Sequence, residues 1–170
     1  MDPLLDEKII LSVSQILPEK LEALVRVRAM REAFGPSKNE GICFEHCTEI
    51  GFYGDLQGIV YLGLDGYTKL KLLPRMAKTE VPNSENKPLS ESIVLSFAKK
   101  LGEELLQEMK LGRFRIEMRE PIDRSHKLVP FDLKRYRQYI LIFFLRDDRE
   151  ELYLGRLTLV LLLEKFGTIV

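Results

Sequence analysis

The carboxyl-terminal segment, residues 138–163, constrains the fold more than any other part of the chain. Two apolar runs, QYILIFFL and LYLGRLTLVLLL, are joined there by the charged segment RDDREE. Long runs rich in β-branched, aromatic and other apolar residues, separated by a short polar connection, are typical of an antiparallel hairpin. In the second run the leucines change parity around Gly155, where a β-bulge would shift the register. The segment therefore predicts two long, paired strands.

The first 35 residues instead carry apolar residues near helical spacing, from Leu4 to Leu17. Proline inside a helix removes a backbone hydrogen bond, so Pro18 predicts the start of a second helix rather than the continuation of the first. This second helix would run through PEKLEALVRVRAMREAF and stop at Gly35 and Pro36. The segment GPSKNEG then predicts a loop.

Residues 41–64 predict another hairpin, because ICFEHCTEIGFY and LQGIVYLGL are rich in β-branched and aromatic residues and YGD between them permits a turn. The following DGYTKLKLLPRMAK predicts a short helix, with Asp65 as its cap and Pro74 as a kink or an early stop. TEVPNSENKPLSE is the clearest internal connection, since it is rich in proline, asparagine and serine.

A long helix is predicted over residues 90–110, with Ser90 as a possible cap. One of its sides is apolar and holds Ile93, Val94, Phe97, Leu101, Leu105 and Met109. A second apolar strip lies beside the first and holds Leu95, Ala98, Gly102 and Leu106. A helix that is apolar over so wide an arc usually packs between two surfaces. RFRIEMREPI then alternates like a strand, and the polar residues 121–134 predict a loop.

Together these elements predict a single α+β domain over residues 1–170, in which a helix-plus-hairpin unit is used twice and antiparallel sheets pack against long helices. Its parts are N-terminal helices (1–35), a hairpin with a helix (41–80), and a long helix with strands and the C-terminal hairpin (90–165). The repeat is one of elements only, because no residue-level repeat accompanies it.

Composition excludes several classes of protein. Lysine plus arginine equals aspartate plus glutamate at 26 each, so no overall field attracts nucleic acid or an anionic membrane. No apolar run reaches the roughly 18 residues that a membrane span needs. The acidic amino terminus, without a small-residue cleavage site, is not typical of a signal peptide. Two cysteines are too few for a secreted disulfide framework, so we expect a soluble, cytoplasmic protein.

The segment CFEHC suggests a metal site, since thiolates and imidazoles bind zinc. On a strand, however, Cys43 and Cys47 would lie roughly 13 Å apart, at about 3.3 Å per residue, and His46 would point to the opposite face. The only other histidine is His126. We therefore expect no metal site and no Cys–His nucleophile, but two buried thiols and a surface imidazole. No phosphate-binding glycine motif is present either.

Residues 110–137 are locally basic, with nine basic against four acidic residues. With Tyr136 and Tyr139 nearby, LKRYRQY has the composition of a surface that stacks bases and neutralises phosphates. Alternating charges of this kind more often form a solvated face. Among partners, an acidic protein surface fits so small a patch better than nucleic acid does.

EIGFYGDLQGIVYLGLDGYTKLKLLPRMA resembles the hairpin and helix of the CheC/CheX family of chemotaxis phosphatases. In that family a strand, a G-x-x-x-G turn and a second strand lead into a helix, and Gly54 and Gly58 fill the glycine positions here. The helix at 90–110, with Gly102, is similar to the family's central helix, and the terminal strands to its closing sheet. The resemblance covers residues 40–165 in pattern rather than identity.

The resemblance implies a helix with an acidic-x-x-x-Glu-x-x-Asn-x-x-x-Gly motif that docks on a phosphorylated receiver domain. There the acid and amide would orient a water towards the aspartyl phosphate, and the receiver would supply its own magnesium. Alignment on Gly102 places Glu91 at the acidic position, but Leu95 and Ala98 at the catalytic ones. Such catalysis depends on positioning, so this alignment predicts loss of the family's chemistry. A second Glu-x-x-amide spacing occurs at Glu104 and Gln107, on a helix face where such residues are common.

These features predict a CheC/CheX-like signalling domain of chemotaxis or two-component systems that binds a protein and does not catalyse. Leu95, Ala98, Lys99 and Gly102 are the predicted partner-binding residues, and the partner would be a receiver domain or a motor protein. A homodimer through open sheet edges at 41–64 and 138–163 is a further expectation. Two alternatives stay open: an aspartyl-phosphate phosphatase that uses Glu104 and Gln107, or Glu91, and an unrelated α+β binding module. No cofactor of its own is expected.

Overall fold

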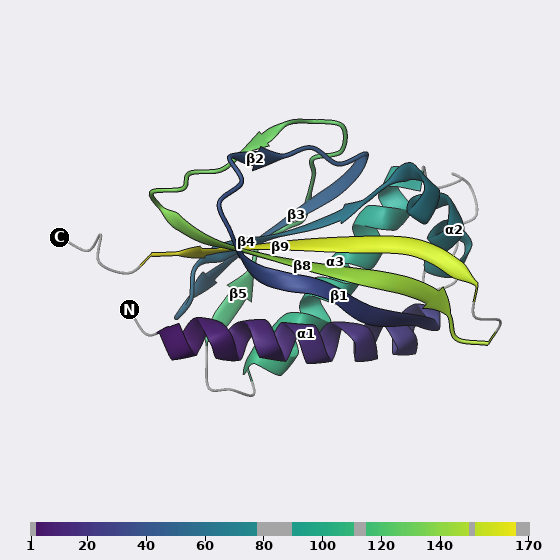
Figure 1. Cartoon of the computed structure of the whole chain (residues 1–170), viewed down its shortest axis with the longest axis horizontal. Coiled ribbons are helices and arrows are strands. Elements are labelled where there is room, and N and C mark those ends of the chain that lie inside the picture. Colours follow the sequence, from purple (N-terminus) through teal and green to yellow (C-terminus); the bar gives the residue numbers. More distant parts are fainter. Residues whose placement is uncertain (1–2, 78–89, 111–114, 150–151, 166–170) are drawn as a thin grey trace.

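The computed structural model describes residues 3–77, 90–110, 115–149 and 152–165. Within these residues seven strands form one antiparallel sheet, helices cover one of its faces, and a two-stranded ribbon covers part of the other (Figure 1). The α+β fold class predicted from the sequence is confirmed. No helix in the described ranges is long and apolar enough to cross a membrane.

The helices are α1 (Pro3–Val25), α2 (Gly66–Ala77) and α3 (Ser90–Lys110). The strands are β1 (Val27–Ser37), β2 (Gly41–Ile42), β3 (His46–Gly54), β4 (Gly58–Leu64), β5 (Ile116–Met118), β6 (Ile122–Asp123), β7 (Val129–Pro130), β8 (Tyr136–Asp147) and β9 (Tyr153–Glu164). The order across the sheet is β1-β8-β9-β4-β3-β5, with β6 also paired to β3, and β2 pairs with β7 in the ribbon.

The two predicted hairpins are present as β3–β4 and β8–β9, and the bulge at Gly155 is confirmed. Leu145 pairs with Gly155 while Arg146 pairs with Tyr153, so Leu154 is the extra residue. Gly155 has φ +117°, and a Cβ there would lie 1.9 Å from Oγ1 of the buried Thr68. That hydroxyl accepts a hydrogen bond from the Arg156 N–H at 3.1 Å. Only glycine fits, because both the backbone conformation and the contact with α2 exclude a side chain.

The prediction of two N-terminal helices was wrong at two points. Pro18 does not divide the helix: α1 runs from Pro3 to Val25 with Pro18 inside it. Leu17 and Leu21 on either side of the proline are 0% and 1% exposed, so burial offsets the lost backbone hydrogen bond. Residues 27–37 are the strand β1, not a continued helix, because Val27 and Ala29 alternate with charged residues and pair with β8.

The predicted open edges were also wrong. Strand β4 lies between β3 and β9, β8 lies between β1 and β9, and β3 pairs with β5 and β6 on its far side. The outermost strands of the described sheet are therefore β1 on one side and the short β5 and β6 on the other. The two units, α1–β1–β3–β4 and α3–β5–β8–β9, exchange strands: β1 pairs with the second unit's hairpin and β5 with the first.

The main core lies between the sheet and the three helices. Leu141, Phe143, Leu145 and Leu159 of the central strands are 0% exposed and face the helices. A smaller apolar cluster, which includes Tyr61, Val129, Phe131 and Val160, lies between the sheet and the β2–β7 ribbon. The inward side of α3 is packed in this main core, which leaves a strip of the helix to meet solvent.

Candidate partner-binding helix

One side of α3 belongs to the core. Val94, Phe97, Leu101 and Leu105 are between 1% and 8% exposed and pack with residues of α1, α2 and the sheet. The prediction that this widely apolar helix packs between two surfaces is confirmed, since α3 contacts the other helices and the sheet. Burial of this side fixes which residues point outward.

Gly102 lies where α3 crosses the sheet. A Cβ at this position would be 2.9 Å from Cδ1 of Ile50 on β3 and 3.2 Å from the sulfur of Met118 on β5. Gly102 is buried, so its missing side chain lets the helix approach both strands closely. Its role in this chain is packing.

Ala98 faces the core one turn before Gly102. It is 3% exposed and lines a small internal space together with Leu21, Thr48 and Met76. Leu95 is half-buried. The buried Ala98 and Gly102 therefore cannot contact a partner while α3 keeps this position, which corrects their place among the predicted partner-binding residues.

The outward strip of α3 is polar and lies between two ion pairs. Lys99 Nζ contacts Oε1 of Glu120, beyond β5, at 3.2 Å, and the Lys99 side chain is 42% exposed. Glu104 Oε2 contacts Nζ of Lys20 on α1 at 3.1 Å, and the Glu104 side chain is also 42% exposed. Glu103 and Gln107 are exposed between and beyond these pairs. We define Leu95, Lys99, Glu103, Glu104 and Gln107 as the α3 strip.

The structure describes the side chains of only some of the remaining predicted catalytic residues. Glu104 and Gln107 lie about one turn apart on the α3 strip, both accessible to solvent. Glu91 belongs to α3, but its side chain lies outside the residues whose side chains are described. The α3 strip therefore offers one acid and one amide near each other, although not at the positions aligned through Gly102.

The cysteines and histidines do not form a reactive site. Cys47 is 2% exposed, and burial, followed by the nearby Glu49, raises the pKa of its thiol to about 12. Cys43 is exposed and His46 is 8% exposed, so the predictions of a buried Cys43 and a surface His46 were wrong. The His46 ring packs edge-on against His126, with centroids 5.6 Å apart, which explains its burial. No group of three or more metal-ligating side chains occurs among the described residues.

The basic residues of segment 110–137 are spread over several elements, and several of them meet acids. Arg124 Nη2 lies 3.2 Å from Oε2 of Glu49, whose Oε1 accepts a 2.6 Å hydrogen bond from the Tyr61 hydroxyl. Arg135 Nε lies 3.5 Å from Oε1 of Glu164. The local excess of positive charge seen along the sequence is therefore partly neutralised in space, as a solvated face of mixed charge would be.

No protein-family model matches the sequence, and no curated protein matches it either. Solved structures do match the fold. A chemotaxis protein CheX from Desulfovibrio desulfuricans has a TM-score of 0.74 at 10% identity, over 92% of this chain and 99% of the other.

Two further solved structures are similar. CheX in the CheX–CheY–BeF3–Mg²⁺ complex from Borrelia burgdorferi has a TM-score of 0.64 at 13% identity, over 92% of this chain and 98% of the other. FliY from Thermotoga maritima has a TM-score of 0.66 at 12% identity, over 96% and 91%. These matches exclude the alternative of an unrelated fold. The chain has the fold of the CheC/CheX chemotaxis proteins.

Proposed function

We propose that this chain is a chemotaxis signalling domain that binds a receiver domain or a motor protein through the α3 strip, without hydrolysing a phosphoryl group. Its fold is that of chemotaxis proteins, one of which was solved in complex with CheY, BeF3 and Mg²⁺. FliY and the middle domain of FliM share the fold as well, which supports a motor protein as the alternative partner.

The proposal rests on the chemical nature of two side chains of α3. In the alignment on Gly102, the positions that would hold an acid and an amide hold Leu95 and the buried Ala98. Neither side chain can hydrogen-bond a water, and phosphoryl-transfer catalysis depends almost entirely on such positioning. Because Leu95 and Ala98 cannot orient a nucleophilic water while the α3 strip remains open to solvent, binding of a partner protein is favoured over hydrolysis.

The α3 strip also has the features of a recognition surface. Half-buried Leu95 supplies apolar area at one end of the strip, and Lys99, Glu103 and Gln107 follow it along the helix with charge and hydrogen-bonding groups. Protein interfaces combine apolar and polar groups of this kind. The ion pairs to Lys20 and Glu120 hold the long side chains in place before binding, which lowers the entropic cost of ordering them.

A binding titration with a charge-reversal variant tests this. A receiver domain activated with BeF3 and Mg²⁺ is titrated with the wild-type chain, with Lys99→Glu, and with Lys127→Glu, an exposed lysine outside α3. We expect Lys99→Glu to change the affinity by about tenfold, since a charge at an interface contributes on the order of 1.4 kcal/mol. Lys127→Glu should bind like the wild type. An equal response of both variants would contradict docking through α3.

The second candidate is a phosphatase that uses Glu104 and Gln107. Their exposure about one helical turn apart on the α3 strip favours it. If this candidate holds, the chain accelerates loss of phosphate from a phosphorylated receiver, and Gln107→Ala removes the acceleration while binding persists. The Glu104 carboxylate is held by Lys20, so Lys20→Ala should then also alter the rate.

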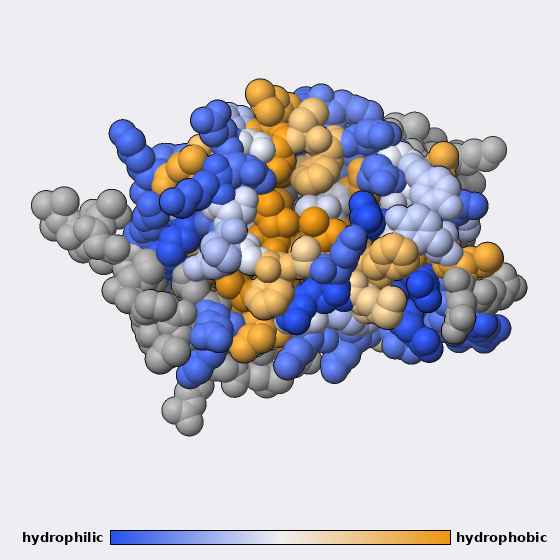
Figure 2. All heavy atoms as spheres, viewed as in Figure 1, coloured by the Kyte–Doolittle hydropathy of each residue, from blue (hydrophilic) through white to orange (hydrophobic). Residues whose placement is uncertain are grey.

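We further propose a homodimer through β1. This strand presents an eleven-residue outer edge, and Met30 and Phe34 on it are 44% and 48% exposed. Figure 2 shows apolar side chains gathered in the middle of the side of the molecule seen in Figure 1. Unpaired edges of this length readily pair with another strand. Size-exclusion chromatography with light scattering should give a dimer, and Met30→Lys with Phe34→Lys a monomer; a monomeric wild type would contradict the proposal.

A further inference from the structure

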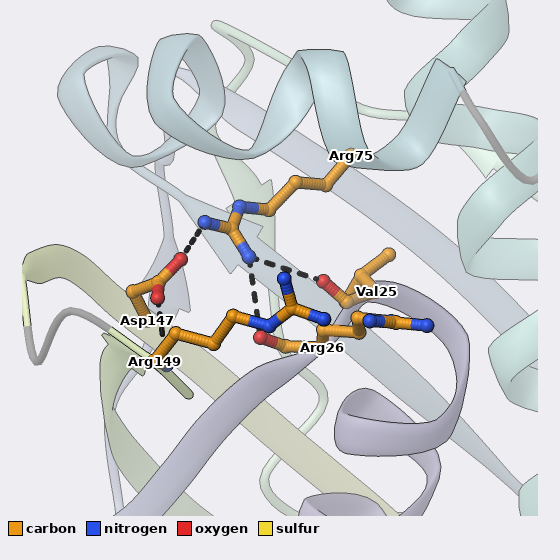
Figure 3. Close-up of polar contacts among 5 residues, drawn as sticks. All are labelled: Val25, Arg26, Arg75, Asp147 and Arg149. Atoms are coloured by element: carbon orange, nitrogen blue, oxygen red, sulfur yellow. Dashed lines mark hydrogen bonds and ion pairs between the residues drawn. The ribbon is translucent and has the colours of Figure 1, made fainter.

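Three segments far apart in the sequence meet at the end of the sheet beside the β8–β9 turn. They are the carboxyl end of α1, the outer face of α2, and the first residues of the turn (Figure 3). Between them lies an open cleft of about 670 Å³. Its charged lining residues are Arg26, Lys71, Arg75, Arg149, Asp147 and Asp148.

Arg75 and Asp147 form the fixed part of this cleft. Arg75 Nη1 donates hydrogen bonds to the carbonyl oxygens of Val25 and Arg26, at 3.4 and 3.2 Å, and Nη2 pairs with Oδ2 of Asp147 (Figure 3). The Arg149 N–H donates to Oδ1 of the same carboxylate at 2.8 Å. Both oxygens of Asp147 therefore accept hydrogen bonds, and this carboxylate, 8% exposed, forms an ion pair with Arg75 inside the lining of the cleft.

The remaining charges of the cleft are mostly positive. Among the described lining residues, Arg26, Lys71 and Arg149 are exposed, and Asp148 is the acid outside the Arg75–Asp147 pair. In Figure 3 the Arg149 side chain extends from the turn towards Arg26, which lies between α1 and β1. Arg26 has φ +54°, and its N–H donates a hydrogen bond to the Glu22 carbonyl oxygen at 3.0 Å, as at many helix ends.

The concentration of positive charge in this cleft is local, because the chain as a whole has equal numbers of basic and acidic residues. It arises only on folding, since its members come from three separate segments.

We infer that this cleft, which we name the basic cleft, binds a small soluble anion with two or more phosphate groups. Guanidinium groups match phosphate oxygens by paired hydrogen bonds, and lysine adds a point charge. The volume lies within the roughly 300–1,000 Å³ of small-ligand sites.

Isothermal titration calorimetry with pyrophosphate and with ATP, at low ionic strength, tests the inference. The wild type should bind at least one probe, and Arg149→Gln combined with Lys71→Gln should weaken binding at least about tenfold, because hydrogen bonds to charged groups are lost. Asp148→Asn should tighten binding several-fold, since it removes a repelling charge. Arg115→Gln, an exposed arginine on β5's side of the sheet, is the matched control and should bind like the wild type.

Each variant is checked by circular dichroism and thermal melting, so that a loss of affinity can be distinguished from a loss of the folded state. Absence of heat with both probes, or equal weakening by Arg115→Gln, would overturn the inference. So would binding to phosphatidylglycerol vesicles without binding to either soluble probe, which would make the basic cleft a membrane contact. The result is independent of the α3 strip, because none of these substitutions touches it.

Discussion

The two sides of α3 differ in how they are held: one is packed in the core and the other meets solvent. The inward side, with Phe97, Leu101 and Gly102, fits the core so closely that a single carbon atom at Gly102 would press on two strands. The outward strip is held only by ion pairs at the surface. The difference teaches that stability and recognition can be separated experimentally in this helix. Substitutions inward should unfold the protein, whereas substitutions outward should change only what it binds.

The largest expected effect is on the inward side. Leu101 is 1% exposed, and Leu101→Ala should lower the free energy of unfolding by about 3 kcal/mol, since it removes buried methyl groups and leaves a cavity. Glu103→Ala, two residues later on the outward strip, should change it by less than about 0.5 kcal/mol. Urea unfolding of both variants measures these two changes in the free energy of unfolding. Similar losses of stability in both variants would show that the two sides of α3 do not differ in their contribution to stability.

Ala98→Asn should have the next largest effect. It restores the amide at the position aligned through Gly102, but places it among apolar side chains at a site that is 3% exposed. A buried amide without a partner costs roughly 1–3 kcal/mol, so we expect destabilisation and, even together with Leu95→Glu, no phosphatase activity. Thermal melting and a phosphate-release assay check this. A stable, active double variant would mean that position 98 reaches the surface in the working protein.

These first two predictions also mark the limits of the sequence. The hairpins, the helix at 90–110 and the bulge at Gly155 were predictable, because each depends on a strong local pattern of apolar residues and glycines. The α3 helix has two adjacent apolar strips, and the sequence did not reveal that Ala98 and Gly102 of the second strip are buried along with the first. Its fit against Ile50 and Met118 depends on strands about 50 and 16 residues away, and this placed Ala98 inside.

Strand β1 and the basic cleft were missed for the same physical reason. The segment VRVRAM alternates over only a few residues and continues a helical pattern, so the local sequence favours a helix. In the structure this segment forms a strand because it pairs with the distant β8. The cleft draws Arg26, Lys71 and Arg149 from three segments, so no stretch of sequence reveals the concentration of charge. The short alternation of valine and arginine at 25–28 was the one available signal for β1.

A small effect on stability is expected where the α3 strip pairs with α1. Lys20→Ala removes the ion pair between Lys20 and Glu104, whose side chains are 25% and 42% exposed, respectively. This should lower the free energy of unfolding by less than about 1 kcal/mol. The loss should shrink further in high salt, because exposed charges are screened. Urea titrations at low and high ionic strength measure it. A loss of stability as large as that of Leu101→Ala would contradict the description of this ion pair as a surface contact.

The most direct test of the central claim follows phosphate release from a phosphorylated receiver domain in Mg²⁺, with this chain at a concentration that saturates binding. The account predicts a bound receiver whose rate of phosphate loss equals its rate alone, because Leu95 and Ala98 cannot orient water. An accelerated rate that Gln107→Ala abolishes would contradict it and would make the α3 strip a catalytic surface.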